Sequence, residues 1–423
     1  MATQTKNQLA QSQRLTSLSH LFEQQRVPFT LLGVGPMSRA IIETGIECAA
    51  EEQAPVVFIA SRNQIDSERF GGGYVEGWTQ SDLHYFVEKQ TQRMPGLWFL
   101  SRDHGGPWQR DDEYQAGLDW ERARASALAS YRDDLDAGFS CLHIDTSRDP
   151  HFEGTVPLDV AVDRVVELVR HTEAHRSRSG AGPVDYEVSL EKTNGAISSV
   201  SEFDYFVGEM VRKLERRLLP RPLFVVANTG TLTKMDGNVG RVDFEAVRHL
   251  RAVTGKYGTI LKEHNADYLD TDDLVQHPAA GIGMANVAPE FGKLETEALL
   301  DLSAREEERL GHDHPEASQL RATLLRHIRP SGRWRKWTHD VHDPEVLFRD
   351  PVWVERVIKV CGHYFFRRED VRDARACLYV NLARLELVED PHELIKAHIR
   401  DRLHRYFEAF NLRALTPMAA EAS

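Results

Sequence analysis

Short apolar runs alternate with longer amphipathic stretches along most of the chain. The runs are rich in β-branched residues, and each is followed by polar or glycine-bearing residues. They span 28–35, 55–61, 97–103, 141–147, 185–191, 222–228, 258–264 and 279–286. These runs are too apolar to alternate between apolar and polar residues, and helices separate them. Such strands are typical of a parallel sheet covered on both faces. Eight successive strand–helix units therefore predict an α/β fold, a closed (β/α)8 TIM barrel.

The pattern changes near residue 295, where the strand signals stop. Segments 294–310 and 393–410 carry apolar residues at spacings of three and four, as amphipathic helices do. We therefore predict a barrel over 1–294 and a C-terminal helical extension over 295–423.

Composition narrows the classes of function. Hydrophobic residues make up 41% and charged residues 28% of 423, enough apolar surface for a large core. The net charge of −13 argues against nucleic acid or an anionic membrane as partner. No apolar run reaches membrane-spanning length, and the N-terminus lacks the apolar core of a signal peptide. The four cysteines are widely spaced, as in reducing compartments, so we expect a cytoplasmic protein.

Polar residues gather at the ends of the predicted strands, where a barrel of this kind carries its active site. Two histidines and a carboxylate, His104, Glu191 and His264, are expected to converge there and to bind a divalent metal, Zn²⁺ or Mn²⁺. Asp103 is the first candidate for proton transfer, with Glu191 and Asp145 as alternatives.

Further polar residues at the strand ends are candidates for substrate binding. They are Asn63, Gln64, His143, Asn228, Glu263, Asn265 and Asn286. For a phosphorylated substrate, glycine-bearing loops after the late strands are expected to hold the phosphate, with Arg62 and Lys192 as charge partners.

Two other motifs receive less weight. Gly33–Val34–Gly35 imitates a dinucleotide-binding turn, but Ser38 stands where the third glycine belongs. The basic, aromatic segment 333–337 (RWRKW) is interpreted as a surface or interface segment because the chain as a whole is acidic.

Four collinear motifs carry a family resemblance. They are NQ at 63–64 with FGGGYVEGWTQSDLHYFV at 70–87, DHGGP at 103–107, AGFSCLHIDTS at 137–147 and KEHNADY at 262–268. They resemble the NQ…FGGYTGMTPADF, DHLGP, AGF-x-KIHLDAS and EAHSTDY stretches of the tagatose-bisphosphate aldolase accessory-subunit family.

The resemblance implies a class II aldolase-like barrel. Some members are non-catalytic partners of a separate aldolase subunit, whereas relatives act alone as metal-dependent epimerases of tagatose, tagatose 6-phosphate or tagaturonate. By position, His104, Glu191 and His264 match the metal site, Asp103 the acid/base and Asp145 a substrate-side carboxylate. The predicted strands 5, 6 and 8 depart from the family pattern, so we expect a different substrate from the namesake's.

Three functions follow as hypotheses. The first is a metal-dependent ketose or ketose-phosphate epimerase that inverts C4 by retro-aldol and aldol chemistry. The alternative is a tagatose-bisphosphate aldolase, either catalytic or as a non-catalytic accessory subunit. The expected ligand is a sugar or sugar phosphate, and the expected protein partner is a second copy of the chain or an aldolase subunit.

Overall fold

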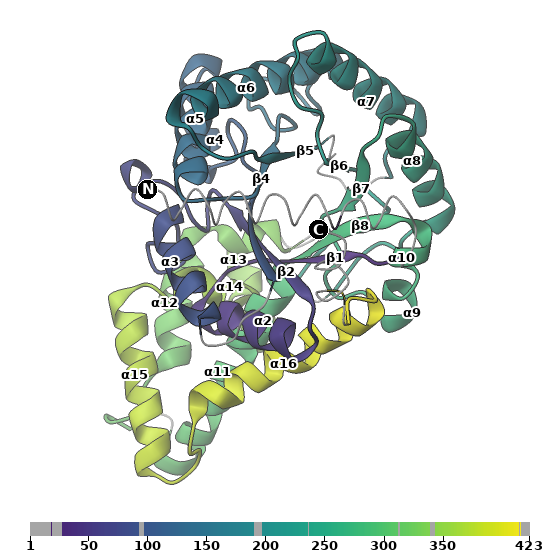
Figure 1. Cartoon of the computed structure of the whole chain (residues 1–423). Helices are drawn as coiled ribbons and strands as arrows, with labels where there is room; N and C mark the ends of the chain where they lie inside the picture. The colour runs from purple at the N-terminus through teal and green to yellow at the C-terminus, as the bar shows by residue number, and fades with distance from the viewer. Residues whose placement is uncertain are drawn as a thin grey trace.

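Eight parallel strands close into a barrel in the order β1 to β8 (Figure 1). The computed structural model describes residues 18, 28–92, 97–189, 197–235, 237–311, 314–338, 343–413 and 415. The strands are β1 (Leu31–Val34), β2 (Pro55–Ser61), β3 (Leu97–Asp103), β4 (Cys141–Ile144), β5 (Asp185–Ser189), β6 (Phe224–Val226), β7 (Ile260–Glu263) and β8 (Ile282–Val287). Each lies within a predicted run or extends one by a single residue, so the predicted barrel is confirmed.

Helices cover the outside of the barrel, as its apolar strands require. The long ones are α2 (Arg39–Glu51), α3 (Gln80–Thr91), α5 (Trp120–Asp136), α6 (Leu158–Ser179), α7 (Val200–Glu215), α8 (Phe244–Lys256) and α11 (Pro289–Leu310). Short elements lie in the loops: η1 (Glu68–Phe70), α4 (Asp111–Gln115), α9 (Thr271–Leu274) and α10 (His277–Ala280).

The C-terminal part contains only helices among its described residues. They are α12 (Leu320–Ser331), η2 (Arg333–Lys336), α13 (Pro344–Leu347), α14 (Pro351–Cys361), η3 (Gly362–Phe365), α15 (Glu369–Arg384) and α16 (Pro391–Ala409). They gather on the α2 side of the barrel, and α16 packs against both α2 and α11 (Figure 1). The division predicted after residue 294 falls inside α11, which therefore connects the two parts.

Gly33 illustrates how the barrel closes between β1 and β8. It pairs with Asn286 in the register of the two strands, and a Cβ at Gly33 would lie 2.4 Å from Asn286 Oδ1. This glycine is thus required by close packing inside a barrel. The closed parallel barrel also excludes the dinucleotide-binding fold that Gly33–Val34–Gly35 imitates.

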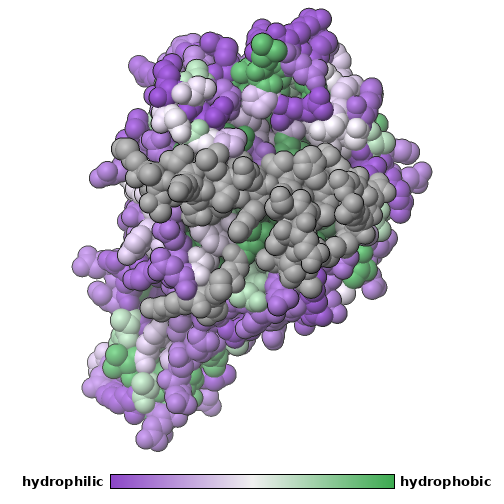
Figure 2. Space-filling view, viewed as in Figure 1, coloured by the Kyte–Doolittle hydropathy of each residue, from purple (hydrophilic) through white to green (hydrophobic). Residues whose placement is uncertain are grey.

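The outer surface is polar where it can be seen. Hydrophilic residues dominate the face shown in Figure 2, with apolar residues in small groups between them. Within the described part of the chain, none of the helices has the length and hydropathy needed to cross a lipid bilayer.

Candidate functional site

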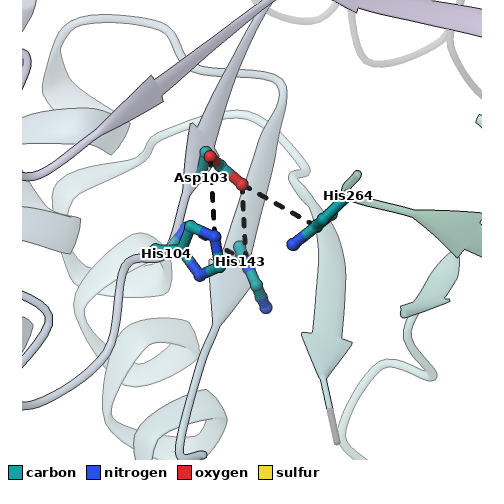
Figure 3. Close-up of side chains that lie close together, drawn as sticks. All are labelled: Asp103, His104, His143 and His264. Carbon is teal, nitrogen blue, oxygen red and sulfur yellow. Dashed lines mark hydrogen bonds and ion pairs between the residues drawn. The ribbon is translucent and has the colours of Figure 1, made fainter. Parts of the chain in front are cut away.

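Three histidines and one aspartate meet at the C-terminal end of the barrel (Figure 3). Asp103 ends β3 and His104 follows it, His143 belongs to β4, and His264 follows β7. One side-chain N or O atom of each lies within 4.8 Å of those of the other three. We call these four residues the His–Asp cluster. Because parallel strands all end on the same side, residues far apart in sequence come together here.

Backbone geometry brings the cluster's loops close together. His104 adopts φ +42°, a left-handed conformation that is uncommon outside glycine. Its N–H donates to His143 Nδ1 over 3.0 Å. Two residues on, a Cβ at Gly106 would lie 1.5 Å from the Asp145 carbonyl oxygen. The DHGGP motif therefore needs glycine at position 106, because the loop after β4 lies directly against it.

Two buried carboxylates support the histidines from behind. Asp145 Oδ2 lies 2.7 Å from His104 Nδ1, and Asp145 also accepts hydrogen bonds from Ser147 and Ser189. Glu187 Oε1 lies 2.7 Å from His264 Nε2, and its Oε2 accepts a 2.6 Å bond from Lys262 Nζ.

The cluster's electrostatics favour ionised carboxylates. Burial alone would raise the pKa of Asp103, but His104, His143 and His264 outweigh it and hold that pKa well below its usual range. Asn286 Nδ2 also donates to Asp103 Oδ1 over 3.2 Å. Burial likewise opposes ionisation of Glu187, yet the attraction of Lys262 and the nearby imidazoles lowers its pKa to about 2.

The donor set suits a divalent cation. Imidazole nitrogens and a carboxylate oxygen are the ligands of Zn²⁺ and Mn²⁺ sites. The nitrogen of His143 that faces the other donors is Nδ1, which lies 3.9 Å from Asp103 Oδ1 and 3.5 Å from Glu187 Oε1. When the imidazoles are neutral, the carboxylates of Asp103, Asp145 and Glu187 carry three negative charges and Lys262 carries one positive charge. The net charge of −2 is one that a divalent ion balances.

The predicted metal ligands are only partly placed by the structure. His104 and His264 come together as expected, whereas Glu191 lies outside the described residues. His143, predicted to bind substrate, instead belongs to the His–Asp cluster. Asp145 lies behind His104 and bonds it, which makes it a positioning residue for that imidazole.

Glu263 requires a correction. Its neighbour His264 points to the cluster, so Glu263 points the opposite way, toward the helices. There its carboxylate accepts hydrogen bonds from Thr229 and Thr231 and lies 2.8 Å from His277 Nε2. Its oxygens are thus committed to structural contacts outside the barrel interior.

Other predicted substrate-binding residues lie at the strand ends with structural partners. Asn63 bonds the backbone of Gln109 and Asp111, and Gln64 Oε1 accepts from the backbone N–H of Ser61. The backbone of Asn228 bonds Ser198, and that of Asn265 accepts from Asn238. Among these substrate candidates, Asn286 contacts the cluster directly, because its side chain donates to Asp103 Oδ1.

The prediction that Arg62 pairs with a substrate phosphate also requires a correction. Its side chain is fully buried and pairs with Asp66 and Glu113, so it is committed inside the fold. Lys192, the other suggested partner, lies outside the described residues.

Sequence reasoning assigns no role in the site to Glu187 or Lys262. Both are fully buried in the barrel interior. A signal was available: Glu187 shares its strand phase with Ser189, and Lys262 precedes His264 by two residues, which places each pair on one face.

Comparison with known proteins gives a family match over part of the chain. Residues 18–191 match a family described as D-tagatose-1,6-bisphosphate aldolase subunit GatZ/KbaZ-like. The family resemblance is confirmed over this part of the chain. The matched segment contains Asp103, His104 and His143, whereas His264 lies beyond it.

Solved structures share the fold. A probable tagatose 6 phosphate kinase from Sinorhizobium meliloti 1021 is 20% identical with TM-score 0.71, covering 90% of this chain and 100% of its own. A putative fructose-1,6-biphosphate aldolase from Coccidioides immitis is 12% identical with TM-score 0.51, covering 96% and 98%. Fructose-bisphosphate aldolase from Campylobacter jejuni is also 12% identical with TM-score 0.51, covering 95% and 94%. At these identities the likeness shows the fold alone.

Proposed function

We propose that this chain acts in metal-dependent aldol chemistry on a ketose or ketose phosphate, as an aldolase of the class II type. The observation that carries the proposal is the His–Asp cluster, at the end of the barrel where such enzymes bind substrate. The match to an aldolase-subunit family supports aldol cleavage over C4 epimerisation, which the sequence alone had placed first.

His104, His143 and His264 would hold the metal ion, with Asp103 beside them. A divalent cation bound there polarises the ketone carbonyl and stabilises the negative charge that develops on its oxygen. The neighbours of Asp103 keep its carboxylate ionised, the form that can accept the proton of the C4 hydroxyl. The C3–C4 bond then breaks: its electron pair goes to the ketone fragment, and C4 leaves as an aldehyde.

Two arrangements around the site keep Asp103 and the imidazoles in place for this step. Asn286 fixes one Asp103 oxygen, and Glu187 orients His264 while Lys262 balances the charge of Glu187. Lys262 is buried and paired with a carboxylate, so a Schiff base at this lysine is not part of the proposal.

The test is turnover by the purified chain alone. Ketohexose bisphosphates, 6-phosphates and free ketohexoses are incubated with Zn²⁺ or Mn²⁺ and then with chelator, and the products are followed by carbon NMR. We expect three-carbon products that disappear with chelator and with Asp103→Asn or His264→Ala. His249→Ala, an exposed histidine on α8, is the matched control and retains turnover.

Other outcomes contradict the proposal in distinct ways. Full turnover by Asp103→Asn would exclude the assigned proton acceptor. A C4 epimer without release of triose would restore the epimerase hypothesis. The family description names a subunit, so an accessory role is the second candidate. It predicts no turnover alone and increased activity or stability of a separate aldolase subunit on mixing.

A further inference from the structure

Four basic side chains that are not members of the His–Asp cluster lie near one another at the C-terminal end of the barrel. Arg148 lies in the loop after β4, Lys234 in the loop after β6, and Arg333 and Lys336 in η2 of the C-terminal part. In the described part of the chain, the carboxylate of Asp111 pairs within the group: it lies 3.5 Å from Arg148 Nη1 and 3.6 Å from Arg333 Nη1. We call Arg148, Lys234, Arg333 and Lys336 the basic group.

The basic group is held together across distant segments. Lys234 Nζ donates to the Lys336 carbonyl oxygen over 3.4 Å, which ties the loop after β6 to η2. Asp111 bridges the two arginines and also joins the barrel, because its N–H donates to Asn63 Oδ1 over 3.1 Å. Contacts from four chain segments thus converge on one small region.

This region lies at the same end of the barrel as the His–Asp cluster. Arg148 follows Asp145, the partner of His104, by three residues in one loop. Asn63 follows β2, whose last residue Ser61 pairs with Asp103 in the sheet register. The basic group and Asp111 therefore lie at the same end of the barrel as the candidate catalytic site, on loops that follow β3, β4 and β6 and on η2.

The tryptophans of the RWRKW segment explain how it presents its charges. Trp334 and Trp337 are buried and anchor η2 in the C-terminal helices. Arg333 is stacked near Tyr364, 4.7 Å from its ring centre, and reaches Asp111. Arg335 instead lies over the Trp334 ring, 4.5 Å from its centre. The segment so contributes Arg333 and Lys336 to the basic group and leaves Arg335 outside it.

We propose that Arg148, Lys234, Arg333 and Lys336 form an anion subsite that binds the phosphate group of a phosphorylated ketose. The inference rests on the proposed function for the sugar end of the ligand, and it names the substrate class. It also gives the C-terminal helices a role, since η2 supplies two of the four cations.

The charge balance supports an anionic ligand. Among the residues that the structure describes, four positive charges face the Asp111 carboxylate, an excess of three. Crowding by protein atoms, together with Arg148, Arg333 and Lys234, lowers the pKa of Lys336, and burial lowers that of Lys234. A bound anion relieves this repulsion.

Phosphate fits better than carboxylate. A carboxylate offers two oxygens, which one guanidinium satisfies, whereas a phosphate offers three oxygens and up to two charges to donors from several directions. The basic group supplies donors from three separate segments.

The experiment measures binding of inorganic phosphate to the full chain by calorimetry and phosphorus NMR at fixed ionic strength. Lys336→Gln and Arg148→Gln are each expected to weaken phosphate binding about tenfold, the scale of one charge-assisted hydrogen bond. Arg335→Gln, from the same segment, is the matched control and binds like the native chain. Melting curves verify that each variant is folded. Because two independent variants are measured, the test still holds when one of them does not fold.

Clear results overturn the proposal. Native affinity in both Lys336→Gln and Arg148→Gln excludes the subsite, as does an absence of phosphate binding by the native chain into the tens of millimolar. Acetate binding more tightly than phosphate excludes the phosphorylated class. His264→Ala separates the two proposals: it abolishes turnover but keeps phosphate binding if the subsite exists, whatever reaction the cluster performs.

Discussion

Asp145 Oδ2 and His104 Nδ1 lie 2.7 Å apart, across the loops that follow β3 and β4. Hydrogen bonds from His104 and Ser147 and the nearby imidazoles outweigh burial and keep the pKa of Asp145 low, so it is an ionised acceptor. An ionised acceptor requires the proton of His104 to reside on Nδ1. The lone pair of Nε2 is then free for a cation, which is how outer carboxylates orient metal-binding histidines.

Asp145→Asn should therefore weaken metal binding. The amide N–H₂ facing Nδ1 favours the tautomer with the proton on Nε2, which removes the ligand lone pair. We expect affinity for Zn²⁺ or Mn²⁺ to fall about 10- to 100-fold, the usual loss on removing such an orienting partner. Competition with a chromogenic chelator measures it. Ser147→Ala, which keeps the carboxylate, is the control; equal affinity in Asp145→Asn and the native chain would exclude the orienting role.

Metal addition should stabilise the fold through the His–Asp cluster. A ligand that binds only the folded state adds about 2.7 kcal/mol at a free concentration one hundred times its Kd. We expect one equivalent of Zn²⁺ or Mn²⁺ to raise the melting temperature, and chelator to reverse the gain. His264→Ala should lose the response and His249→Ala should keep it. A full response in His264→Ala would place the metal elsewhere, for example at Cys48, Glu51 and His404, whose donor atoms also lie close together.

The fold could be predicted because each strand carries its own local signal. The apolar runs mark all eight strands, including β8, which is rich in small residues. Its composition has a packing cause: a Cβ at Gly33 would also lie 2.9 Å from the Met284 side chain, so the β1–β8 seam has little spare volume. How the C-terminal helices pack was not predictable, because an amphipathic helix shows that it has a buried face but not what covers it.

The site was only partly predictable. Strand ends identify Asp103, His104 and His264, because every C-terminal end of a parallel barrel faces one side. The face of each residue is harder to assign where both faces of a strand are buried. The sequence therefore predicts Glu263 in the site although it points outward, and it assigns no role to Glu187 or Lys262 although they point inward.

The buried carboxyl group of Asp267 predicts a pH dependence of the free energy of unfolding. Burial and the nearby charge of Glu290 raise the pKa of Asp267 to about 8. This folded-state pKa lies above the unfolded value. The contribution of Asp267 to the free energy of unfolding is therefore fully present below about pH 4 and is lost as the pH rises toward 8.

Asp267→Asn should remove this dependence. The amide oxygen can still accept from the N–H groups of Ala288 and Glu290, which now bond Asp267 Oδ1. We expect the free energy of unfolding of Asp267→Asn, relative to the native chain, to rise from pH 4 to pH 8 by on the order of a few kcal/mol and then level off. Denaturant titrations across this range measure it. Asp272→Asn, at an exposed site, should show no such trend; a flat difference for Asp267→Asn would mean that Asp267 titrates normally.

Tyr406 offers a test of how the C-terminal part is joined to the barrel. Its hydroxyl, on α16, lies 2.9 Å from the Ala266 carbonyl oxygen after β7 and 2.6 Å from Glu290 Oε2 at the start of α11. The ring is fully buried, so these bonds replace water rather than compete with it. Tyr406→Phe keeps the ring and leaves a buried carbonyl and carboxylate with fewer donors. We expect it to cost about 1–3 kcal/mol of unfolding free energy in a single cooperative transition.

Tyr205→Phe is the matched control, since that hydroxyl bonds Asp159 at the exposed surface of α7. Its loss should change stability by less than about 0.5 kcal/mol. Denaturant unfolding followed by both tryptophan fluorescence and circular dichroism reports whether the chain unfolds as one unit. If Tyr406→Phe separated the transition into two steps, the extension would be a domain of its own, held to the barrel mainly by this contact. One shared transition would instead mean that α16 is part of the barrel's outer layer, with Tyr406 linking it to the loop after β7.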